Sequence, residues 1–128
     1  MNKPLFSLAI GLVAAATLAG APLPALGDES VIVISRQYAA PGRERELQER
    51  FLKVVAYVRK AEPGYTYRLY HSRKDPAVFV FYEVYPSQAA FEHHAKVTFP
   101  AMRKDLGPPA EGIFSRPAET ETFTALTD

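Results

Sequence analysis

Hydrophobic and polar positions along the first half of the chain follow two periods in turn, which predict a strand and then a helix. The strand is expected over Val31–Tyr38, where the sequence VIVISRQY is rich in β-branched residues. A helix is expected from Arg43, because apolar residues then recur at helical spacing and form one face. That face consists of Leu47, Phe51, Val54, Val55 and Val58. Pro63-Gly64 is expected to end this helix.

The same pattern predicts a hairpin and a second helix next. Alternation predicts a strand over Tyr65–His71, and the sequence AVFVFYEVY predicts another over Ala77–Tyr85. Ser87 is suited to cap the second helix. One face of that helix carries Ala90, Phe91, His94, Ala95 and Thr98.

Two prolines, Pro100 and Pro117, are expected to limit the secondary structure in the last part of the chain. Pro100 is expected to interrupt the second helix, with one further turn over Ala101–Leu106. A final strand is expected over Ile113–Phe123, and Pro117 within it indicates a sheet edge or a bulge. The fold class is therefore α+β, a ferredoxin-like β-α-β-β-α-β antiparallel sheet with both helices on one face.

The strand Ala77–Tyr85 is mainly apolar on both of its faces. Its side chains alternate between Val78, Val80, Tyr82 and Val84 on one face and Phe79, Phe81, Glu83 and Tyr85 on the other. Two helices can cover only one face of the sheet, and a sheet with one wet face should alternate apolar and polar residues. A homodimer that buries the second face is expected. The alternative is a monomer whose C-terminal tail covers the apolar patch.

Residues 1–27 have the layout of a secretory signal peptide. Lys3 is followed by the uncharged apolar run Leu5–Gly20, and Ala25-Leu26-Gly27 places small residues before a cleavage site. The alternative is an uncleaved anchor, but the run is shorter than the ~20 residues that a membrane-spanning helix needs. Residues 28–128 would form the mature domain. We expect a periplasmic or secreted protein with no stable membrane anchor after cleavage.

The amino-acid composition excludes several classes of stabilisation, partner and cofactor. The chain contains no cysteine, so packing and not disulfides must stabilise it. Without Lys3 the basic and acidic residues are equal in number, which argues against a nucleic-acid partner. His71, His93 and His94 lack the spacing of a metal site, and the isolated glycines do not form a phosphate-binding loop. We therefore expect neither a metal nor a cofactor.

Several segments resemble the antibiotic biosynthesis monooxygenase family, which includes quinol monooxygenases. They are Glu62-Pro63-Gly64, Asp75-Pro76, Phe79–Tyr85 and Ala90–His94, within a similarity that extends from about Val31 to Phe123. The resemblance implies a dimeric α/β barrel with a pocket between helices and sheet, and cofactor-independent oxidation of phenols or quinols by O₂. The family's strand glutamate, following aromatic residue and helix histidine fall on Glu83, Tyr85 and His94. A second histidine of quinol monooxygenase-like members falls on Phe99.

His94 is the main candidate for catalysis. It lies on the expected inner face of its helix, whereas His93 is turned about 100° away toward solvent. A histidine in a partly dry pocket can act as a general base, and Arg36 could stabilise the resulting oxyanion. The candidate substrate-binding residues are Tyr70, Tyr82, Tyr85, Phe91 and Phe99. The alternative is a structural His94 that is buried and bonded to a strand.

Glu83 is the third catalytic candidate, and it needs a partner because an unpaired buried carboxylate is costly. Arg36 or Arg68 on a neighbouring strand could form a structural ion pair with it. The leading hypothesis is a cofactor-free monooxygenase for a small aromatic, phenolic or quinol substrate. The alternative is a non-enzymatic ligand-binding or stress-response module. A third hypothesis is haem binding, but Ser35 stands where haem-degrading relatives carry an asparagine, which argues against haem degradation.

Overall fold

The structure, a computed structural model, describes residues 29–127, so the predicted signal peptide lies outside the described residues. The elements follow the predicted order, and four antiparallel strands form one sheet in the order β2-β3-β1-β4. They are β1 (Val31–Tyr38), α1 (Glu44–Ala61), β2 (Thr66–His71), β3 (Val78–Tyr85), α2 (Gln88–His93), the π-helical turn η1 (His94–Thr98), α3 (Phe99–Leu106) and β4 (Glu119–Thr124). The predicted ferredoxin-like α+β fold is confirmed.

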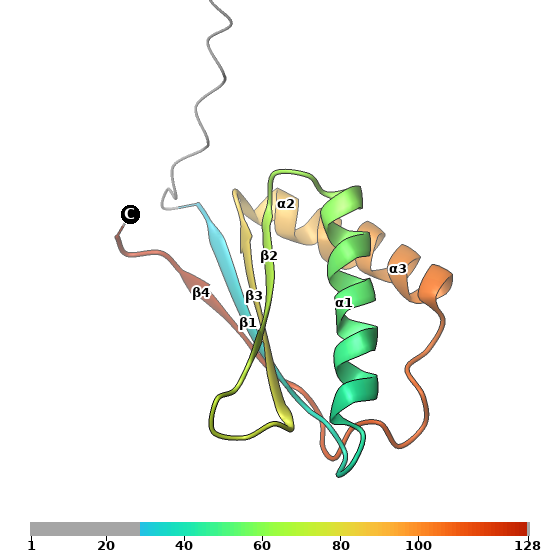
Figure 1. Ribbon diagram of the computed structural model, residues 1–128. Coiled ribbons are helices and arrows are strands. Elements are labelled where there is room, and N and C mark those ends of the chain that lie inside the picture. The colour runs from blue at the N-terminus through green and yellow to red at the C-terminus, as the bar shows by residue number, and fades with distance from the viewer. Residues whose placement is uncertain (1–28, 128) are drawn as a thin grey trace, which may run out of the picture.

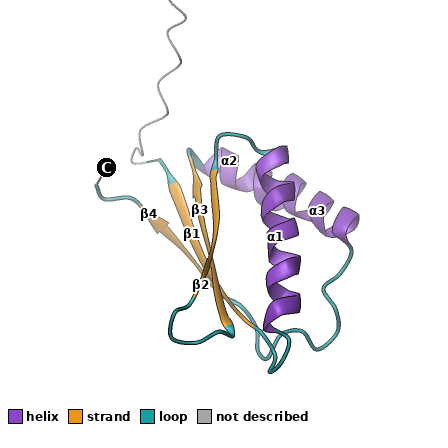
Figure 2. Cartoon of the chain, in the orientation of Figure 1, coloured by secondary structure: helices purple, strands orange, loops and turns teal. Residues whose placement is uncertain are grey.

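The helices form one layer on one side of the sheet (Figure 1). Helix α1 lies along the strands, and the continuous segment α2-η1-α3 crosses near one end of the sheet (Figure 2). The predicted apolar face of α1 is buried in full and packs on β2 and β3. Phe51 meets Phe79 and Phe81 edge to face, with ring centroids 5.7 and 4.8 Å apart. The main core therefore lies between α1 and the centre of the sheet.

Strand register decides which side chains face the helices. Ser35 pairs with Phe81 and Arg36 pairs with Val80, and directly paired residues project from the same face. The helix side of β3 therefore carries Phe79, Phe81, Glu83 and Tyr85. Its other side carries Val78, Val80, Tyr82 and Val84, over which the described residues place no helix. We call this second surface the open face of the sheet.

The second helix begins as predicted and continues without a break to Leu106, the predicted end of its further turn. The Ser87 hydroxyl accepts a hydrogen bond from the Ala90 amide at 3.1 Å, which confirms the cap. Pro100 does not break the helix, because η1 precedes it and Pro100 occupies the first turn of α3, where a missing N–H costs little. The predicted interruption is therefore wrong. Proline is accommodated by a wide turn in which the Phe99 amide bonds the His94 carbonyl.

The last strand is shorter than predicted. Ile113 and Ser115 bond the backbone of Ala40 and Tyr38, but this is an isolated bridge outside β4. Pro117 follows in the stretch that leaves the sheet, since it has no N–H for a ladder. Pairing resumes only at β4, which is an edge strand as Pro117 indicated.

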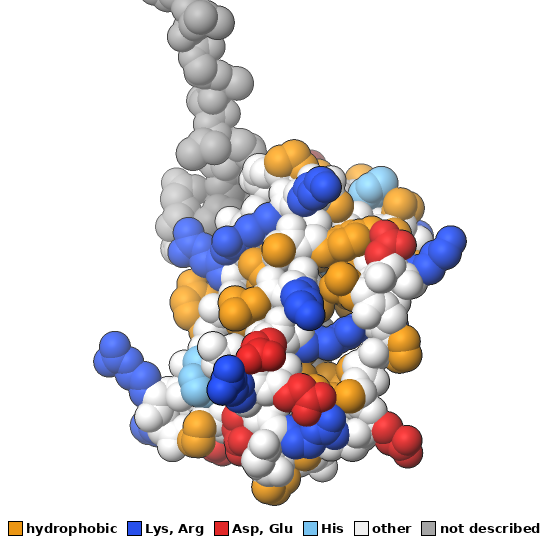
Figure 3. Space-filling model, turned by 45° about the vertical axis from the view of Figure 1, so that its right-hand side comes forward, with side chains coloured by type: hydrophobic (Ala, Val, Ile, Leu, Met, Phe, Trp, Pro, Cys, Tyr) orange, Lys and Arg blue, Asp and Glu red, His pale blue; other side chains and the backbone are white. Residues whose placement is uncertain are grey.

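The outer surface is mixed in charge. On the side displayed in Figure 3, basic and acidic side chains are interspersed among apolar ones. Within residues 29–127, none of the helices is long and apolar enough to cross a membrane.

Candidate functional site

A buried hydrogen-bonded group joins the end of α1 to η1. His94 is 5% exposed, and its Nδ1 lies 2.8 Å from Oε2 of Glu62, which is itself 6% exposed. The Thr98 hydroxyl donates to the other carboxylate oxygen, Oε1, at 2.6 Å. Both oxygens of this carboxyl group therefore have a partner. We call Glu62, His94 and Thr98 the histidine cluster.

Local sequence explains how these three side chains meet. Glu62 is the residue that ends α1, and its amide still bonds the Val58 carbonyl at 2.8 Å. Gly64, with a φ of 96°, then allows the sharp reversal into β2 that an L side chain rarely permits. His94 and Thr98 are four residues apart, so they lie on the same side of their helix. The chain reversal places the Glu62 carboxylate against the side of η1 that carries His94 and Thr98.

A second buried pair lies beside the cluster on the helix side of β3. The Tyr85 hydroxyl donates to Glu83 Oε2 at 2.6 Å. Burial raises the pKa of Glu83, while the Tyr85 hydrogen bond and the nearby His94 act in the opposite direction. Burial, and then the Glu83 carboxylate, raise the pKa of both Tyr67 and Tyr85. Both phenols therefore keep their protons at neutral pH.

Aromatic rings enclose the His94 imidazole. Its centroid lies 5.1 Å from that of Tyr85, 5.7 Å from Tyr67 and 6.2 Å from Phe99. Phe91 packs on Tyr85 with a centroid distance of 5.5 Å. Phe99 is 40% exposed, so this wall reaches the surface of the molecule. An apolar, aromatic ligand suits such surroundings.

The second ring nitrogen of His94 remains available. Nε2 makes no hydrogen bond to another described residue, whereas Nδ1 is bonded to Glu62. Among residues 29–127, every fully buried side-chain nitrogen or oxygen has a hydrogen-bond partner, so Nε2 is not fully sealed. Nε2 is therefore the ring nitrogen of His94 that has no hydrogen-bond partner among the described residues.

The π-helical turn places Phe99 next to His94. In a regular α-helix, side chains five residues apart are separated by about 140° around the axis. Here the hydrogen bond from the Phe99 amide to the His94 carbonyl spans five residues and widens the turn. The two rings are consequently neighbours. Turns of this kind frequently occur at functional sites.

The predicted site residues divide between the two sides of the sheet. His94, Glu83, Tyr85, Phe91 and Phe99 gather on the helix side, around the histidine cluster. The remaining three, Arg36, Tyr70 and Tyr82, line a hollow on the open face. Alternation along the strands causes this separation, and within one chain Arg36 lies on the other side of the sheet from His94.

The expected ion pair of Glu83 is wrong for the same reason. Arg36 and Arg68 pair across the sheet with Val80 and Tyr82, which face the open side, whereas Glu83 faces the helices. Glu83 is satisfied instead by the Tyr85 hydroxyl from its own strand.

The site also contains Glu62 and Thr98, two residues to which the sequence pattern assigns no role in chemistry. In the sequence, Glu62 stands out only as part of the Glu62-Pro63-Gly64 turn, and Thr98 only as a member of a helix face. One sequence feature could have predicted this group: a carboxylate, Glu62, at the end of one helix, and a histidine and a threonine four residues apart on the other helix.

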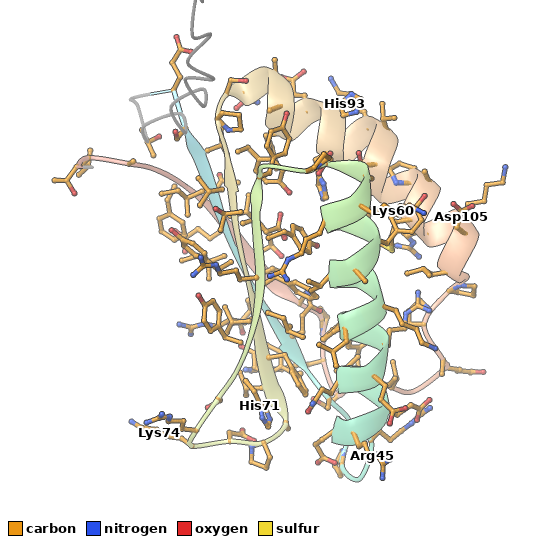
Figure 4. The ribbon with its side chains drawn as sticks, turned by 45° about the horizontal axis from the view of Figure 1, so that its top comes forward. Arg45, Lys60, His71, Lys74, His93 and Asp105 are labelled. Atoms are coloured by element: carbon orange, nitrogen blue, oxygen red, sulfur yellow. The ribbon has the colours of Figure 1, made fainter. Side chains whose placement is uncertain are left out.

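The other two histidines lie elsewhere. His93 is exposed, as predicted, on the outer side of its helix, and His71 lies at the opposite end of the sheet beside the β2-β3 turn (Figure 4). His71 Nε2 is 2.7 Å from the Pro76 carbonyl. No group of three or more His, Cys, Asp or Glu side chains that could hold a metal ion occurs within the described range.

Comparison with solved structures supports the fold. A protein of Pseudomonas aeruginosa is 27% identical, with 77% of this chain and 96% of that chain covered and a TM-score of 0.59. A protein of Mycobacterium tuberculosis is 24% identical, with 77% and 97% covered and a TM-score of 0.60. SnoaB, a cofactor-independent oxygenase from Streptomyces nogalater, is 20% identical, with 78% and 96% covered and a TM-score of 0.59.

Comparison with functionally curated proteins finds no match. The family model described as antibiotic biosynthesis monooxygenase matches residues 30–98, which include β1, the whole of α1 and the complete histidine cluster. With this match over more than half of its length, the chain belongs to the antibiotic biosynthesis monooxygenase family.

Proposed function

We propose that this protein is a cofactor-independent monooxygenase that uses O₂ to oxidise a small aromatic substrate of the phenol or quinol class. The observation that carries the proposal is His94, which is bonded through Nδ1 to a buried carboxylate and surrounded by aromatic rings with Nε2 unbonded. Similarity in fold to SnoaB, a cofactor-independent oxygenase, agrees with this chemistry.

The first step is proton transfer. A phenol that stacks between Phe99 and Tyr85 places its hydroxyl toward His94 Nε2, which takes the proton as a general base. The resulting phenolate is electron-rich and is shielded from bulk water by the rings around it. The Tyr67 hydroxyl keeps its proton and interacts with the Glu83 carboxylate, and by turning from Glu83 it can donate a hydrogen bond to the phenolate oxygen. Tyr67 thus takes the stabilising role that the sequence suggested for Arg36.

The second step transfers electrons from the phenolate to O₂. One oxygen atom bonds to a ring carbon that carries hydrogen, and the other oxygen leaves as water. Oxidation of a phenol to a quinone in this way consumes one O₂ and releases one H₂O, with no external reductant. The protein's part is to remove the proton, hold the ring and exclude solvent.

The test measures O₂ uptake and quinone formation with a panel of phenols and hydroquinones. We expect turnover by the wild type and a loss of about 10²-fold or more in His94→Ala, as is typical when a general base is removed. His93→Ala is the matched control, because His93 is the exposed neighbour on the same helix, and it should retain activity. If the wild type consumes no O₂ with any panel member but binds one of them, the ligand-binding alternative is favoured.

We also propose that two copies associate through the open face of the sheet. This face is lined by Ile34, Val78, Val80 and Tyr82, and the described residues leave it without a covering layer. Apolar area yields about 25 cal/mol per Å² when it is buried, so pairing two such faces is favourable. The tail alternative has little support, since Leu126 is 94% exposed.

Sedimentation at micromolar concentration tests this association. We expect a dimeric mass for the wild type and a monomeric mass for Val80→Asp, which places a charge in the middle of the face. Leu52→Asp is the control, because Leu52 is exposed on α1 and its variant should remain dimeric. A monomeric wild type contradicts the proposal.

Export from the cytoplasm is proposed from sequence alone, on the layout of residues 1–27. Mass spectrometry of the protein from the producing cell should find Asp28 as the first residue. An intact N-terminus in that protein would contradict it.

A further inference from the structure

We propose that Glu62 is a positioning residue that fixes the tautomer and orientation of His94, so that Nε2 is the nitrogen that accepts the substrate proton. This inference rests on the proposed function for its catalytic meaning, but not for its structural content. Glu62 lies behind the imidazole, on the side away from a ligand that reaches Nε2, and it therefore acts only through His94.

The hydrogen bonds define the direction of this effect. An ionised carboxylate only accepts hydrogen bonds, so a bond at 2.8 Å requires the proton to sit on Nδ1. In the neutral imidazole this leaves the lone pair on Nε2. Outside this protein, carboxylates that bond one ring nitrogen are known to orient histidine bases in the same way.

Thr98 in turn holds the carboxylate. Its hydroxyl donates to Oε1 at 2.6 Å, so the Glu62 side chain is fixed at both oxygens and cannot rotate away from His94. Thr98 and His94 lie on η1, whereas Glu62 lies at the end of α1. The cluster therefore also connects the two helical segments beside the aromatic rings around His94.

The other ionisable groups around His94 do not replace Glu62. Tyr67 and Tyr85 lie against the ring from β2 and β3, and both keep their protons. Glu83 is near enough to interact with the charge of His94, but its carboxyl group is engaged by the Tyr85 and Tyr67 hydroxyls. Arg103 lies beyond Phe99, 6.0 Å from the centre of that ring. Glu62 alone among these groups is bonded to the imidazole.

Nitrogen NMR of ¹⁵N-histidine-labelled protein tests the tautomer without any substrate. In the wild type, at a pH where His94 is neutral, we expect the proton on Nδ1 and a bare Nε2. In Glu62→Ala, the form with the proton on Nε2 should become populated. A wild-type signal with the proton on Nε2, or an unchanged tautomer in a folded Glu62→Ala protein, overturns the proposal.

Kinetics separate positioning from a merely structural role. Glu62→Gln keeps the shape of the side chain but removes the charge and one acceptor oxygen, which covers the case in which Glu62→Ala does not fold. With a hydroquinone that the wild type oxidises, we expect kcat to fall about tenfold or more and KM to change less than about twofold. A change in KM alone would overturn the positioning role.

Glu92→Gln is the matched control, because Glu92 is an exposed carboxylate on α2 whose partner is Lys96. It should leave both kcat and the His94 tautomer unchanged. Failure of the proposed function is recognised separately: an inactive wild type with the proton on Nδ1 keeps the positioning inference and rejects the oxygenase.

Discussion

Both faces of the sheet carry apolar side chains, but only one of them is covered within a single chain. The helix side is buried under α1, whereas the open face remains partly exposed to solvent. On the helix side, Phe79 and Phe81 are packed under α1, and the polar groups Glu83 and Ser35 have hydrogen-bond partners. On the open face, Tyr70 is 48% exposed and Phe123 is 39% exposed. The chemistry of the site and the proposed association of two copies are therefore separated by the thickness of one sheet.

This separation teaches that an apolar strand can serve two purposes at once. Strand β3 contributes Glu83 and Tyr85 to the buried site and Val80 and Tyr82 to the surface proposed to bind a second copy. Because neighbouring residues project from opposite faces, a change at one position leaves the other face in place. Single substitutions can thus test each face by itself.

The largest contrast is expected between Phe81 and its neighbour Tyr82. Phe81→Ala removes a ring packed against Phe51 and Tyr67, and it should lower the free energy of unfolding by about 3–5 kcal/mol. Tyr82→Ala should destabilise in a way that depends on protein concentration, because its face is proposed to be covered only in the dimer. Urea denaturation at two protein concentrations measures both. A concentration-independent loss in Tyr82→Ala would contradict a dimer through this face.

An intermediate effect is expected from the pH dependence of Glu83. Its folded-state pKa is raised above the ordinary value of 4.5, mainly by burial. As pH rises from about 4.5 toward the folded pKa, the unfolded chain loses this proton first, so stability falls. Glu83→Gln cannot ionise and should gain stability relative to wild type over this range. Urea unfolding between acidic and neutral pH measures the difference.

Glu92→Gln is the control, because its effect on stability at neutral pH should have the opposite sign to that of Glu83→Gln. The hydrogen bond from Lys96 lowers the pKa of Glu92, so its contribution is present above the ordinary pKa and is lost as pH falls. The glutamine variant should therefore lose a little stability at neutral pH. If both variants changed in the same direction, burial would not be what distinguishes the two carboxyl groups.

The smallest effect is expected on the open side. The Arg116 guanidinium lies 3.6 Å from the centre of the Tyr38 ring, and Arg116 also approaches Glu119 at 3.6 Å. Arg116→Ala should cost about 0.5–1 kcal/mol, the value of an exposed cation–π contact. Arg45→Ala, which removes only a surface ion pair on α1, should cost less in the same thermal unfolding experiment. Equal losses would mean that the stacking on Tyr38 contributes nothing measurable.

The elements could be predicted well because their signals are local. The apolar spacing of α1, the Ser87 cap and the alternation in β3 each depend on residues close together in the chain. The errors occurred where proline acts through its surroundings. Pro100 is accommodated by η1, and Pro117 lies where the chain leaves the sheet before β4. The sequence shows that a proline lacks a backbone N–H. It does not show whether the surrounding structure needs a hydrogen bond at that position.

His94 could be predicted as an inward residue because helical periodicity places it on the apolar face, and the structure buries it there. Its partner could not, since Glu62 is 32 residues away and reaches His94 only after the chain has reversed at Gly64. The sequence places Arg36 and Glu83 on neighbouring strands, which makes an ion pair between them plausible. Only the register between β1 and β3 shows that they project from opposite faces.

The sequence by itself determined the order of the elements, the apolar stripe of α1, the two-sided apolar character of β3 and the inward position of His94. These features follow from periods of 3.6 and 2 residues, which are fixed by backbone geometry. The tertiary structure decided which polar groups satisfy one another: Glu62 with His94 and Thr98, and Glu83 with Tyr85. Burial forces every polar group to find a partner, but only packing in three dimensions decides which one is within reach.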